Sequence, residues 1–217
     1  MASNKLNICY VIFDFNSDFK ISPTKFRGFM AHLFSNISEF HHHSEQSYHY
    51  PLIQYKRINS KLAIIGIGKY ADIVNQNIPS IEHITTETQK IPVNNIQLTN
   101  SVFDLQYSLS KYRFISPWIA LNKQNYEKYR TLSGSERKKI LEKVLVGNIL
   151  SMYKGLGIFI QDKIEVSILK QISKPVTAHE NRFIGFHPIF ASNTKLPEFF
   201  GVGKSVSKGF GTIQEIK

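Results

Sequence analysis

Three consecutive histidines, His41, His42 and His43, stand on a polar stretch that is followed by Tyr48. Histidine titrates near neutral pH, so these side chains can accept or donate a proton under physiological conditions. The group therefore predicts acid–base chemistry. Two other interpretations stay open. One is a solvated loop without a ligand. The other is a metal site built from His41 and His43, for which Glu45 is the only adjacent carboxylate.

Cleavage of RNA is one reaction that these side chains can perform. The ribose 2′-hydroxyl is the nucleophile, so an enzyme must remove its proton, protonate the departing 5′-oxygen and stabilise the charged phosphorane. Histidine can serve as the base or the acid. Tyrosine and lysine can hold the phosphate or stabilise its charge.

A glycine-rich segment, residues 201–211, is a second candidate site. It contains four glycines in eleven residues, which lets a backbone approach phosphate groups closely. Its polar residues are Lys204, Ser205, Ser207 and Lys208. A nucleotide-binding P-loop is disfavoured because Glu198 occupies the place of its first glycine, and a dinucleotide fingerprint fails at Val206. The segment favours polyanion binding, with a ligand-free turn as the alternative.

A third motif, residues 147–157, reads as the end of a long helix. Gly155 is expected to be the glycine cap of this helix. Lys154 precedes it and can either face RNA or interact with the negative end of the helix dipole.

The first half of the chain predicts elements that place the histidine loop between a helix and a strand. Ser22 and Pro23 form a suitable helix start. The order β-α-β-β-α-β is that of a ferredoxin-like unit. Strands are expected over residues 5–15, 48–58, 61–67 and 84–90, and helices over 23–37 and 70–75.

The second half is expected to form another ferredoxin-like domain, so that the chain is α+β with two tandem domains, 1–95 and 96–217. The elements expected there are extended segments 102–108 and 112–121, a helix over 136–153, and strands over 164–169 and 182–190.

Composition indicates the class of partner. The net charge is +11, from 27 lysines and arginines against 16 acidic residues. Such an excess favours a polyanion, because neutralising phosphates releases counterions. The single cysteine, Cys9, lies in an apolar strand; it predicts a buried structural thiol and excludes an internal disulfide and a cysteine-based zinc site. No apolar stretch approaches the about 18 residues of a membrane helix, so a cytoplasmic protein is expected.

Five segments together resemble the CRISPR-associated endoribonucleases that process repeat RNA into guide RNAs, in particular a shorter branch of that family. The likeness covers nearly the whole chain, and its most specific part is the C-terminal glycine-rich loop. The segments are Phe26–Phe29, His41–His43, Tyr50–Lys56, Gly147–Ser151 and Gly201–Gly211.

The resemblance implies two ferredoxin-like domains and cleavage within CRISPR repeats without a metal or other cofactor, leaving a 2′,3′-cyclic phosphate and a 5′-hydroxyl. It implies catalytic roles for His41, His43 and Tyr48, with the choice of general base left open. Supporting phosphate contacts would come from Lys56 and Arg27. The residues implied in RNA binding are Lys154, Lys204, Ser205, Ser207 and Lys208.

The partner implied is CRISPR repeat RNA, and no membrane is expected. Association with proteins of a CRISPR effector complex and formation of a homodimer are both left open. A non-catalytic repeat-RNA-binding subunit of such a complex would use the same fold and basic surface, and it is the main alternative. A metal-dependent hydrolase built on the histidine cluster is a third hypothesis.

Overall fold

The computed structural model describes residues 5–15, 21–40, 49–86, 89–178 and 181–217. The chain divides into two compact units. The first consists of Met1–Asp104 with Ser207–Gly209, and the second of Leu105–Val206 with Phe210–Lys217. The division after Asp104 lies later in the sequence than the boundary expected near residue 95. Three residues of the glycine-rich segment belong to the first unit.

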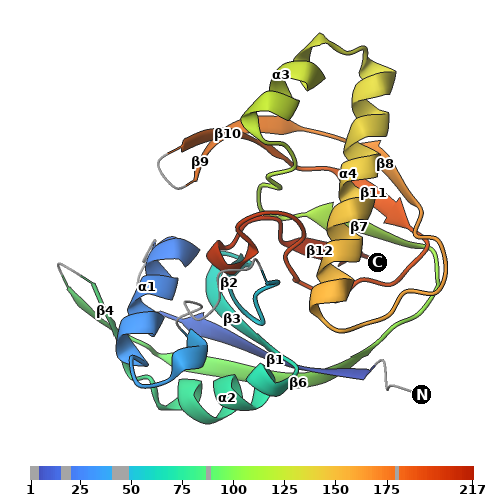
Figure 1. Ribbon diagram of the computed structural model, residues 1–217. Helices are drawn as coiled ribbons and strands as arrows, with labels where there is room; N and C mark the ends of the chain where they lie inside the picture. The colour runs from blue at the N-terminus through green and yellow to red at the C-terminus, as the bar shows by residue number, and fades with distance from the viewer. Residues whose placement is uncertain (1–4, 16–20, 41–48, 87–88, 179–180) are drawn as a thin grey trace. The chain divides into compact units, whose positions relative to one another are not determined.

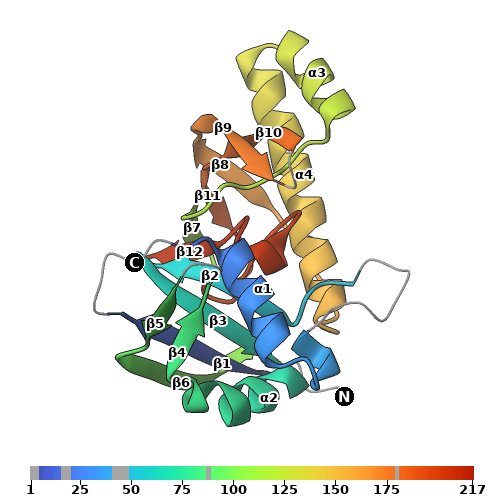
Figure 2. The same ribbon diagram turned by 90° about the vertical axis from the view of Figure 1, so that its left-hand side faces the viewer.

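The first unit is built on an antiparallel sheet with the strand order β2-β3-β1-β6 (Figure 1). Its strands are β1 (Lys5–Asp14), β2 (Ile53–Ile58), β3 (Lys61–Ile67) and β6 (Asn95–Asp104). Helices α1 (Pro23–Leu33) and α2 (Lys69–Asn77) add side chains to one core on the same face of this sheet (Figure 2). The order β1-α1-β2-β3-α2-β6 confirms the predicted ferredoxin-like unit.

The core of the first unit follows from the alternation of side chains along β1. Cys9, Val11 and Phe13 are fully buried on the face that meets the helices. The Phe26 ring of α1 lies edge-on to Phe13, with 5.1 Å between centroids, and edge-on to Tyr55 of β2 at 5.9 Å. Such edge-to-face pairs are favourable beyond the area they bury. The three rings hold α1 over β1 and β2.

Helix α1 starts where the sequence predicts. The Ser22 side chain accepts a hydrogen bond from the Lys25 amide at 3.2 Å, and Pro23 occupies the first turn. The helix ends at Leu33, earlier than the predicted residue 37. A 3₁₀ turn at Ser38–Phe40 follows, and the Phe40 ring stacks on Phe34 at 4.6 Å.

The single strand predicted over residues 84–90 is wrong. Two short strands, β4 (His83–Thr85) and β5 (Lys90–Pro92), pair with each other in a separate hairpin. Thr86 stabilises the turn, since its amide and its hydroxyl both donate to the Gln89 carbonyl oxygen, at 2.8 and 3.0 Å. The fourth strand of the main sheet is β6 instead.

The second unit contains an antiparallel sheet with the order β12-β7-β11-β8. Helix α4 (Gly134–Gly155) contacts β8, and its Glu142 carboxylate accepts a hydrogen bond from the Ile168 amide at 2.8 Å. The sheet strands are β7 (Ser110–Phe114), β8 (Val166–Lys170), β11 (Ile189–Ser192) and β12 (Ile213–Ile216).

Three elements of the second unit differ from the prediction. The strand expected over 182–190 is split, because β10 (Asn181–Phe186) pairs with β9 (Ser173–Ala178) in a hairpin outside the main sheet. The strand expected over 112–121 ends at Phe114. Gly155 is the last helical residue of α4 rather than its cap, and Gly157 adopts the left-handed conformation with φ of 70°.

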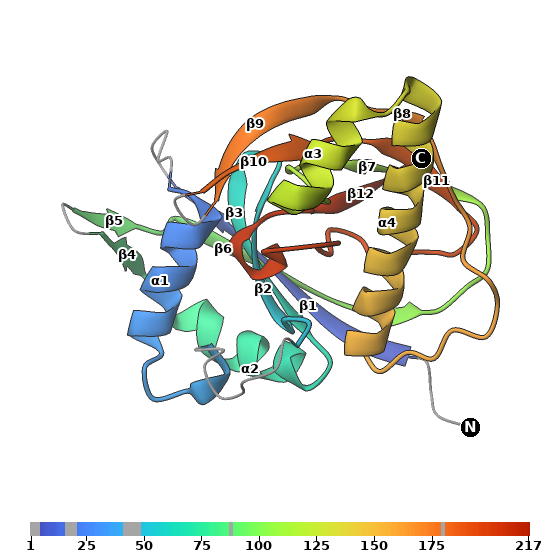
Figure 3. The same ribbon diagram turned by 45° about the horizontal axis from the view of Figure 1, so that its top comes forward.

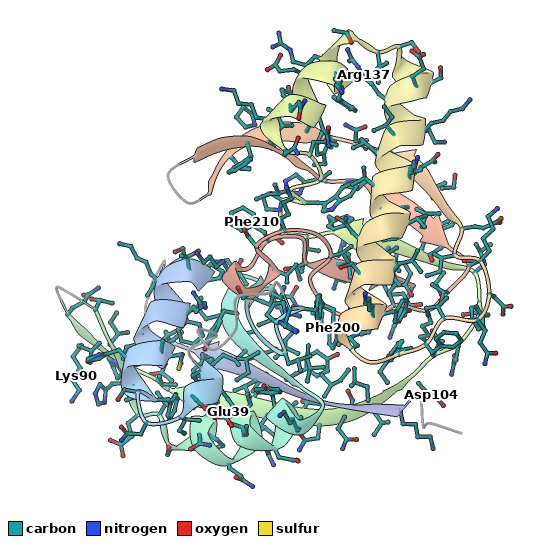
Figure 4. All side chains as sticks on the ribbon, viewed as in Figure 1. Glu39, Lys90, Asp104, Arg137, Phe200 and Phe210 are labelled. Carbon is teal, nitrogen blue, oxygen red and sulfur yellow. The ribbon has the colours of Figure 1, made fainter. Side chains whose placement is uncertain are left out.

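Helix α3 (Lys123–Thr131) is not anticipated by the sequence pattern. It lies beside the first turns of α4 (Figure 3). Arg137 of α4, labelled in Figure 4, donates a 3.1 Å hydrogen bond to the Tyr129 carbonyl oxygen, and its guanidinium lies 5.4 Å from the centroid of that ring. Charged residues dominate α3, so tertiary contacts rather than an apolar stripe position it.

None of the helices in the described part of the chain is both long enough and apolar enough to span a lipid bilayer.

Two substitutions on α1 should have opposite effects on stability. Phe26→Ala removes a fully buried ring and should lower the free energy of unfolding by about 3–5 kcal/mol. Gly28→Ala places a methyl group in open space and should raise that free energy by roughly 0.5–1 kcal/mol. Urea unfolding followed by circular dichroism measures both. A destabilised Gly28→Ala variant would contradict the exposed position of Gly28.

Candidate nucleic-acid interface

A pair of buried donors lies between α1 and β2 in the first unit. The Nε atom of Arg27 is buried and has no hydrogen-bond partner among the described residues, and the same holds for the Tyr55 hydroxyl. Burial raises the pKa of Tyr55 above its ordinary value, and the positive charge of Arg27 partly opposes this rise. The guanidinium is therefore within electrostatic reach of the hydroxyl. An anion at this position would supply an acceptor to donors whose burial is otherwise costly.

Lys208 and Gly209 bring the glycine-rich segment to the same elements. Gly209 has φ of 91°, and a Cβ atom there would lie 2.7 Å from the Pro23 ring and 3.3 Å from the Tyr55 carbonyl oxygen. Only glycine fits this approach. Burial lowers the pKa of Lys208, and the charge of Arg27 lowers it further. The structure thus places Arg27 and Lys208 close enough to repel, and a shared anion would relieve that repulsion.

Lys56 lies on β2 next to Tyr55 in sequence but on the other face of the strand. Its side chain is fully buried, and this burial lowers its pKa from 10.5 to about 7. A lysine with such a pKa can exchange a proton near neutrality. Of the two residues expected to contact phosphate, Lys56 therefore lies on β2 and Arg27 on α1.

The glycine-rich segment is also anchored in the second unit, at Trp118. The Trp118 indole N–H donates to Asn148 Oδ1 at 3.0 Å. Gly203, with φ of 100°, lies on this pair. A Cβ atom on Gly203 would come within 2.7 Å of the indole nitrogen and 2.8 Å of Asn148 Oδ1. Trp118 itself is fully buried, stacks on Phe114 and exchanges backbone hydrogen bonds with Phe186.

Residues that follow Gly203 present the polar groups predicted to bind RNA. Lys204 is exposed, while Ser205 adopts a left-handed φ of 56°, which is uncommon for a serine. The turn is closed by a 2.8 Å hydrogen bond from the Val202 amide to the Gly211 carbonyl oxygen. Ser207 is half-buried and belongs with Lys208 to the first unit. The predicted RNA-binding residues of this segment are thus divided between the units.

Lys154 occupies the last turn of α4 and is exposed. It lines an open groove of the second unit together with apolar side chains that include Leu150 and the exposed Phe159. Its surroundings are compatible with either of the roles considered from the sequence, contact with RNA or interaction with the helix dipole.

The predicted catalytic residues His41, His43 and Tyr48 lie outside the described residues, as do His42 and Glu45. Their neighbours in sequence are well anchored, because Phe40 is fully buried and Tyr50 is only 8% exposed.

Cys9 has the character of a structural thiol, as predicted. It is fully buried on β1, and burial together with the nearby Asp72 raises its pKa to about 11. It is therefore protonated at neutral pH and a poor nucleophile or metal ligand. Within the described ranges, no three histidine, cysteine or acidic side chains gather as a metal site.

Sequence reasoning missed Trp118, Tyr55 and Asn148 as residues that shape the candidate interface. Trp118 is the single tryptophan of the chain, and Asn148 lies within the third sequence motif. These two features distinguish Trp118 and Asn148 in the sequence, but they do not indicate that the two residues contact each other and Gly203.

Comparison with known proteins gives consistent matches over the whole chain. Residues 4–104 match the family described as the Cas6b N-terminal domain, and residues 104–216 match the Cas6b C-terminal domain. A protein of Methanocaldococcus jannaschii, "Uncharacterized protein MJ0978", is 43% identical over 115 residues, which are 53% of this chain and 78% of that protein.

Solved structures agree. A Cas6b crystal structure superposes with a TM-score of 0.86 at 28% identity, covering 98% of this chain and all of that chain. A second, of the CRISPR RNA processing endoribonuclease Cas6b, has a TM-score of 0.76 at 28% identity with the same coverage. Thermus thermophilus Cas6, at 10% identity and a TM-score of 0.58 over the full length of both chains, shares the fold.

Gly203→Ala should destabilise the protein by about 1–3 kcal/mol, because it adds a left-handed alanine whose Cβ meets the Trp118–Asn148 pair. It should also shift the fluorescence of Trp118, the single tryptophan. Urea unfolding and emission spectra measure the two effects. Gly147→Ala, where the added Cβ meets nothing, is the matched control. Equal behaviour of the two variants would contradict the tight packing at Gly203.

Lys56→Met should change how stability depends on pH. The pKa of Lys56 falls from 10.5 to about 7 on folding, so between these values the unfolded chain binds more protons. Stability of the natural protein should therefore rise as pH increases above about 7, by up to about 1.4 kcal/mol per pH unit for one proton. Urea unfolding across pH 7 to 9 measures this slope.

The rise should be smaller in Lys56→Met. It should persist in Lys61→Met, a control that removes a part-exposed lysine paired with Asp14 at 2.9 Å. An unchanged slope in Lys56→Met would assign the titration to another group.

Proposed function

The chain belongs to the Cas6b family of CRISPR RNA processing endoribonucleases, and we propose that it cuts CRISPR precursor RNA within the repeats without a metal ion. In the proposed reaction, the 2′-oxygen of one nucleotide attacks the adjacent phosphorus atom. The bond to the 5′-oxygen of the next nucleotide breaks. The products are a 2′,3′-cyclic phosphate and a 5′-hydroxyl, and the mature guide RNA follows from such cuts.

His41 and His43 are proposed to transfer the protons. One imidazole would take the proton of the 2′-hydroxyl, and the other would protonate the departing 5′-oxygen. The reaction therefore consumes no net proton. Tyr48 would hold the scissile phosphate. The nearest described aromatic residues on either side of this segment, Phe40 and Tyr50, are both buried.

The observation that supports the proposal most directly is that the charge of Arg27 acts on Lys208, so that two cations of the first unit lie within electrostatic reach of each other. The phosphorane bears more negative charge than the substrate phosphate, so cations already in place stabilise the transition state most. The N-terminal end of α1 adds a partial positive charge of its own. Lys56 would support the same charge from the other face of β2.

RNA is proposed to be held by the glycine-rich segment, through Lys204, Ser205, Ser207 and Lys208, and by Lys154. The general attraction comes from the net charge of +11, which acts on any phosphate backbone. Recognition of the repeat would come from contacts that this charge cannot supply. Handover of the product to a CRISPR effector complex is compatible with this arrangement.

The purified protein is expected to cut labelled CRISPR repeat RNA at a single position in excess EDTA. A 2′-deoxy nucleotide immediately before the scissile phosphate should abolish the cut, because the nucleophile is missing. Gel electrophoresis of substrates with one deoxy substitution each locates the site. Loss of cleavage in EDTA would contradict a metal-independent reaction.

The double substitution His41→Ala, His43→Ala should lower the single-turnover cleavage rate by at least about 10²-fold, as expected when acid–base groups are removed. The Kd for repeat RNA should stay unchanged. His83→Ala, on the β4 hairpin of the first unit, is the matched control and should cut normally. Full activity in the double variant would overturn the histidine assignment, and tight binding without cutting by the natural protein would favour a non-catalytic subunit.

A further inference from the structure

Helix α4 has a buried face and an exposed face. It spans 22 residues and contacts β8 in the second unit (Figure 1). The residues of its buried face recur every three or four positions, and they are Leu141, Leu145, Ile149, Met152 and Tyr153. A second set with the same spacing lies roughly half a turn away around the helix and is exposed throughout: Lys139, Lys143, Gly147, Leu150 and Lys154.

The exposed face of α4 carries a row of lysines. Lys139 and Lys143 lie one turn apart, and Lys154 lies in the last turn of the helix. From the first lysine to the last, the row is about 22 Å long at the usual rise per residue. Within the described ranges, none of the three takes part in an ion pair. Their charges are therefore available to an external anion.

Acidic side chains do not cancel this row. Between Lys139 and the end of the helix, the only acidic residue is Glu142, and its carboxylate accepts the Ile168 amide of β8 at 2.8 Å. Glu136 precedes the row, in the first turn of α4, and lies within electrostatic reach of Lys139. Its carboxylate is held by the amide and the hydroxyl of Ser133, at 2.9 and 2.7 Å. Beyond the first turn, the exposed face is purely basic.

An apolar groove lies at the C-terminal end of the lysine row. Lys154 lines this groove of about 440 Å³ together with Leu150 and Phe159. Phe159 is 74% exposed and Leu150 is 42% exposed. Contiguous exposed apolar side chains of this kind commonly mark a binding site. An aromatic ring next to a cation suits a ligand that has both a flat ring and a negative charge, and a nucleotide has both.

The backbone at the end of α4 keeps Lys154 available and positions Phe159. The Ile158 amide donates to the Tyr153 carbonyl oxygen at 2.9 Å, and the Gly157 amide donates to the Lys154 carbonyl oxygen at 3.1 Å. These two bonds form the Schellman arrangement, which satisfies carbonyl groups of the last turn without a side chain. The Lys154 ammonium is therefore not needed as a cap. The same turn brings Phe159 back to the groove beside Leu150.

We propose that the exposed face of α4, together with Phe159, is a binding surface for single-stranded RNA. Lys139, Lys143 and Lys154 contact phosphates along the strand, and Phe159 stacks on one unpaired base. The inference rests on the proposed function in that RNA is the polyanion. It adds a surface distinct from the glycine-rich segment, because Asn148, where Gly203 contacts α4, lies on a different side of the helix.

The dependence of affinity on salt tests the lysine row. Each phosphate contact with a single strand contributes about 0.7 to the slope of log Kd against log salt concentration. For an oligouridylate, which lacks any repeat sequence, Lys143→Ala should reduce this slope by about 0.7, and the triple variant Lys139→Ala, Lys143→Ala, Lys154→Ala by about 2. Fluorescence anisotropy measures the Kd values.

Lys163→Ala is the matched control for Lys143→Ala. It removes the same charge from the second unit, but Lys163 lies outside α4 and pairs with Glu165 at 3.0 Å. Its slope should equal that of the natural protein. An unchanged slope in the triple variant, or equal slopes in Lys143→Ala and Lys163→Ala, would overturn the proposal.

The stacking role of Phe159 is tested separately. Phe159→Ala should raise the Kd for oligouridylate at least about fivefold, and the salt slope should stay the same because no charge is removed. Leu109→Ala, which changes a residue 79% exposed in the second unit, should leave the Kd unchanged. Crosslinking to RNA that contains 5-iodouridine, followed by mass spectrometry, should identify Phe159. An unchanged Kd in Phe159→Ala, or lysine-dependent binding to phosphatidylglycerol vesicles but not to RNA, would overturn the assignment.

Cleavage of repeat RNA in EDTA distinguishes failure of this inference from failure of the proposed function. If the natural protein cuts the repeat and the triple variant binds oligouridylate with an unchanged slope, the RNA surface on α4 is overturned and the cleavage function stands. If the natural protein does not cut but the slope falls in the triple variant, the surface on α4 is supported and the cleavage function is overturned.

Discussion

The close approach of glycine residues to neighbouring backbone is the constraint on which the candidate interface depends. Gly209 meets the first turn of α1, and a Cβ atom on Gly211 would lie 2.1 Å from the Val202 carbonyl oxygen. No larger residue fits at either point, so the backbone path between them is narrowly restricted. Lys208, which precedes Gly209, lies within electrostatic reach of Arg27. The glycines thus contribute to the candidate interface by restricting the backbone next to the cation Lys208.

Cationic side chains in the first unit are buried to different degrees. Exposed cations suit general attraction of a polyanion, and partly buried cations suit binding of an anion at one site. The net charge of +11 attracts any polyanion, and such attraction carries no information about sequence or position. A partly buried cation interacts more strongly with an anion in its own site. When no anion is bound there, the free-energy cost of burying the charge is larger. Arg27 and Lys208 have this second character, and fully buried Lys56 represents its extreme.

The two units contain related antiparallel sheets whose edge strands differ. In the second unit, amides of both edge strands are hydrogen-bonded, that of Ile168 on β8 to Glu142 and that of Glu215 on β12 to Glu198. In the first unit, both helices are present and β6 keeps an open edge. Agreement with a Cas6b structure at a TM-score of 0.86 despite 28% identity indicates that the fold tolerates extensive exchange of side chains. Packing patterns, rather than individual residues, preserve it.

The sequence by itself determined the features that rest on short-range pattern. These are the ferredoxin-like order of the first unit, the start of α1 at Ser22, the long helix α4, the buried Cys9 and the basic character, because alternation, capping and composition are local properties. Only the tertiary structure decided which residues meet. The choice of β6 as fourth strand, the burial of Lys56, the electrostatic proximity of Arg27 to Lys208 and the hydrogen bond of Trp118 to Asn148 all depend on positions distant in sequence. No local pattern encodes such pairings, since they follow from how the sheet and its helices pack.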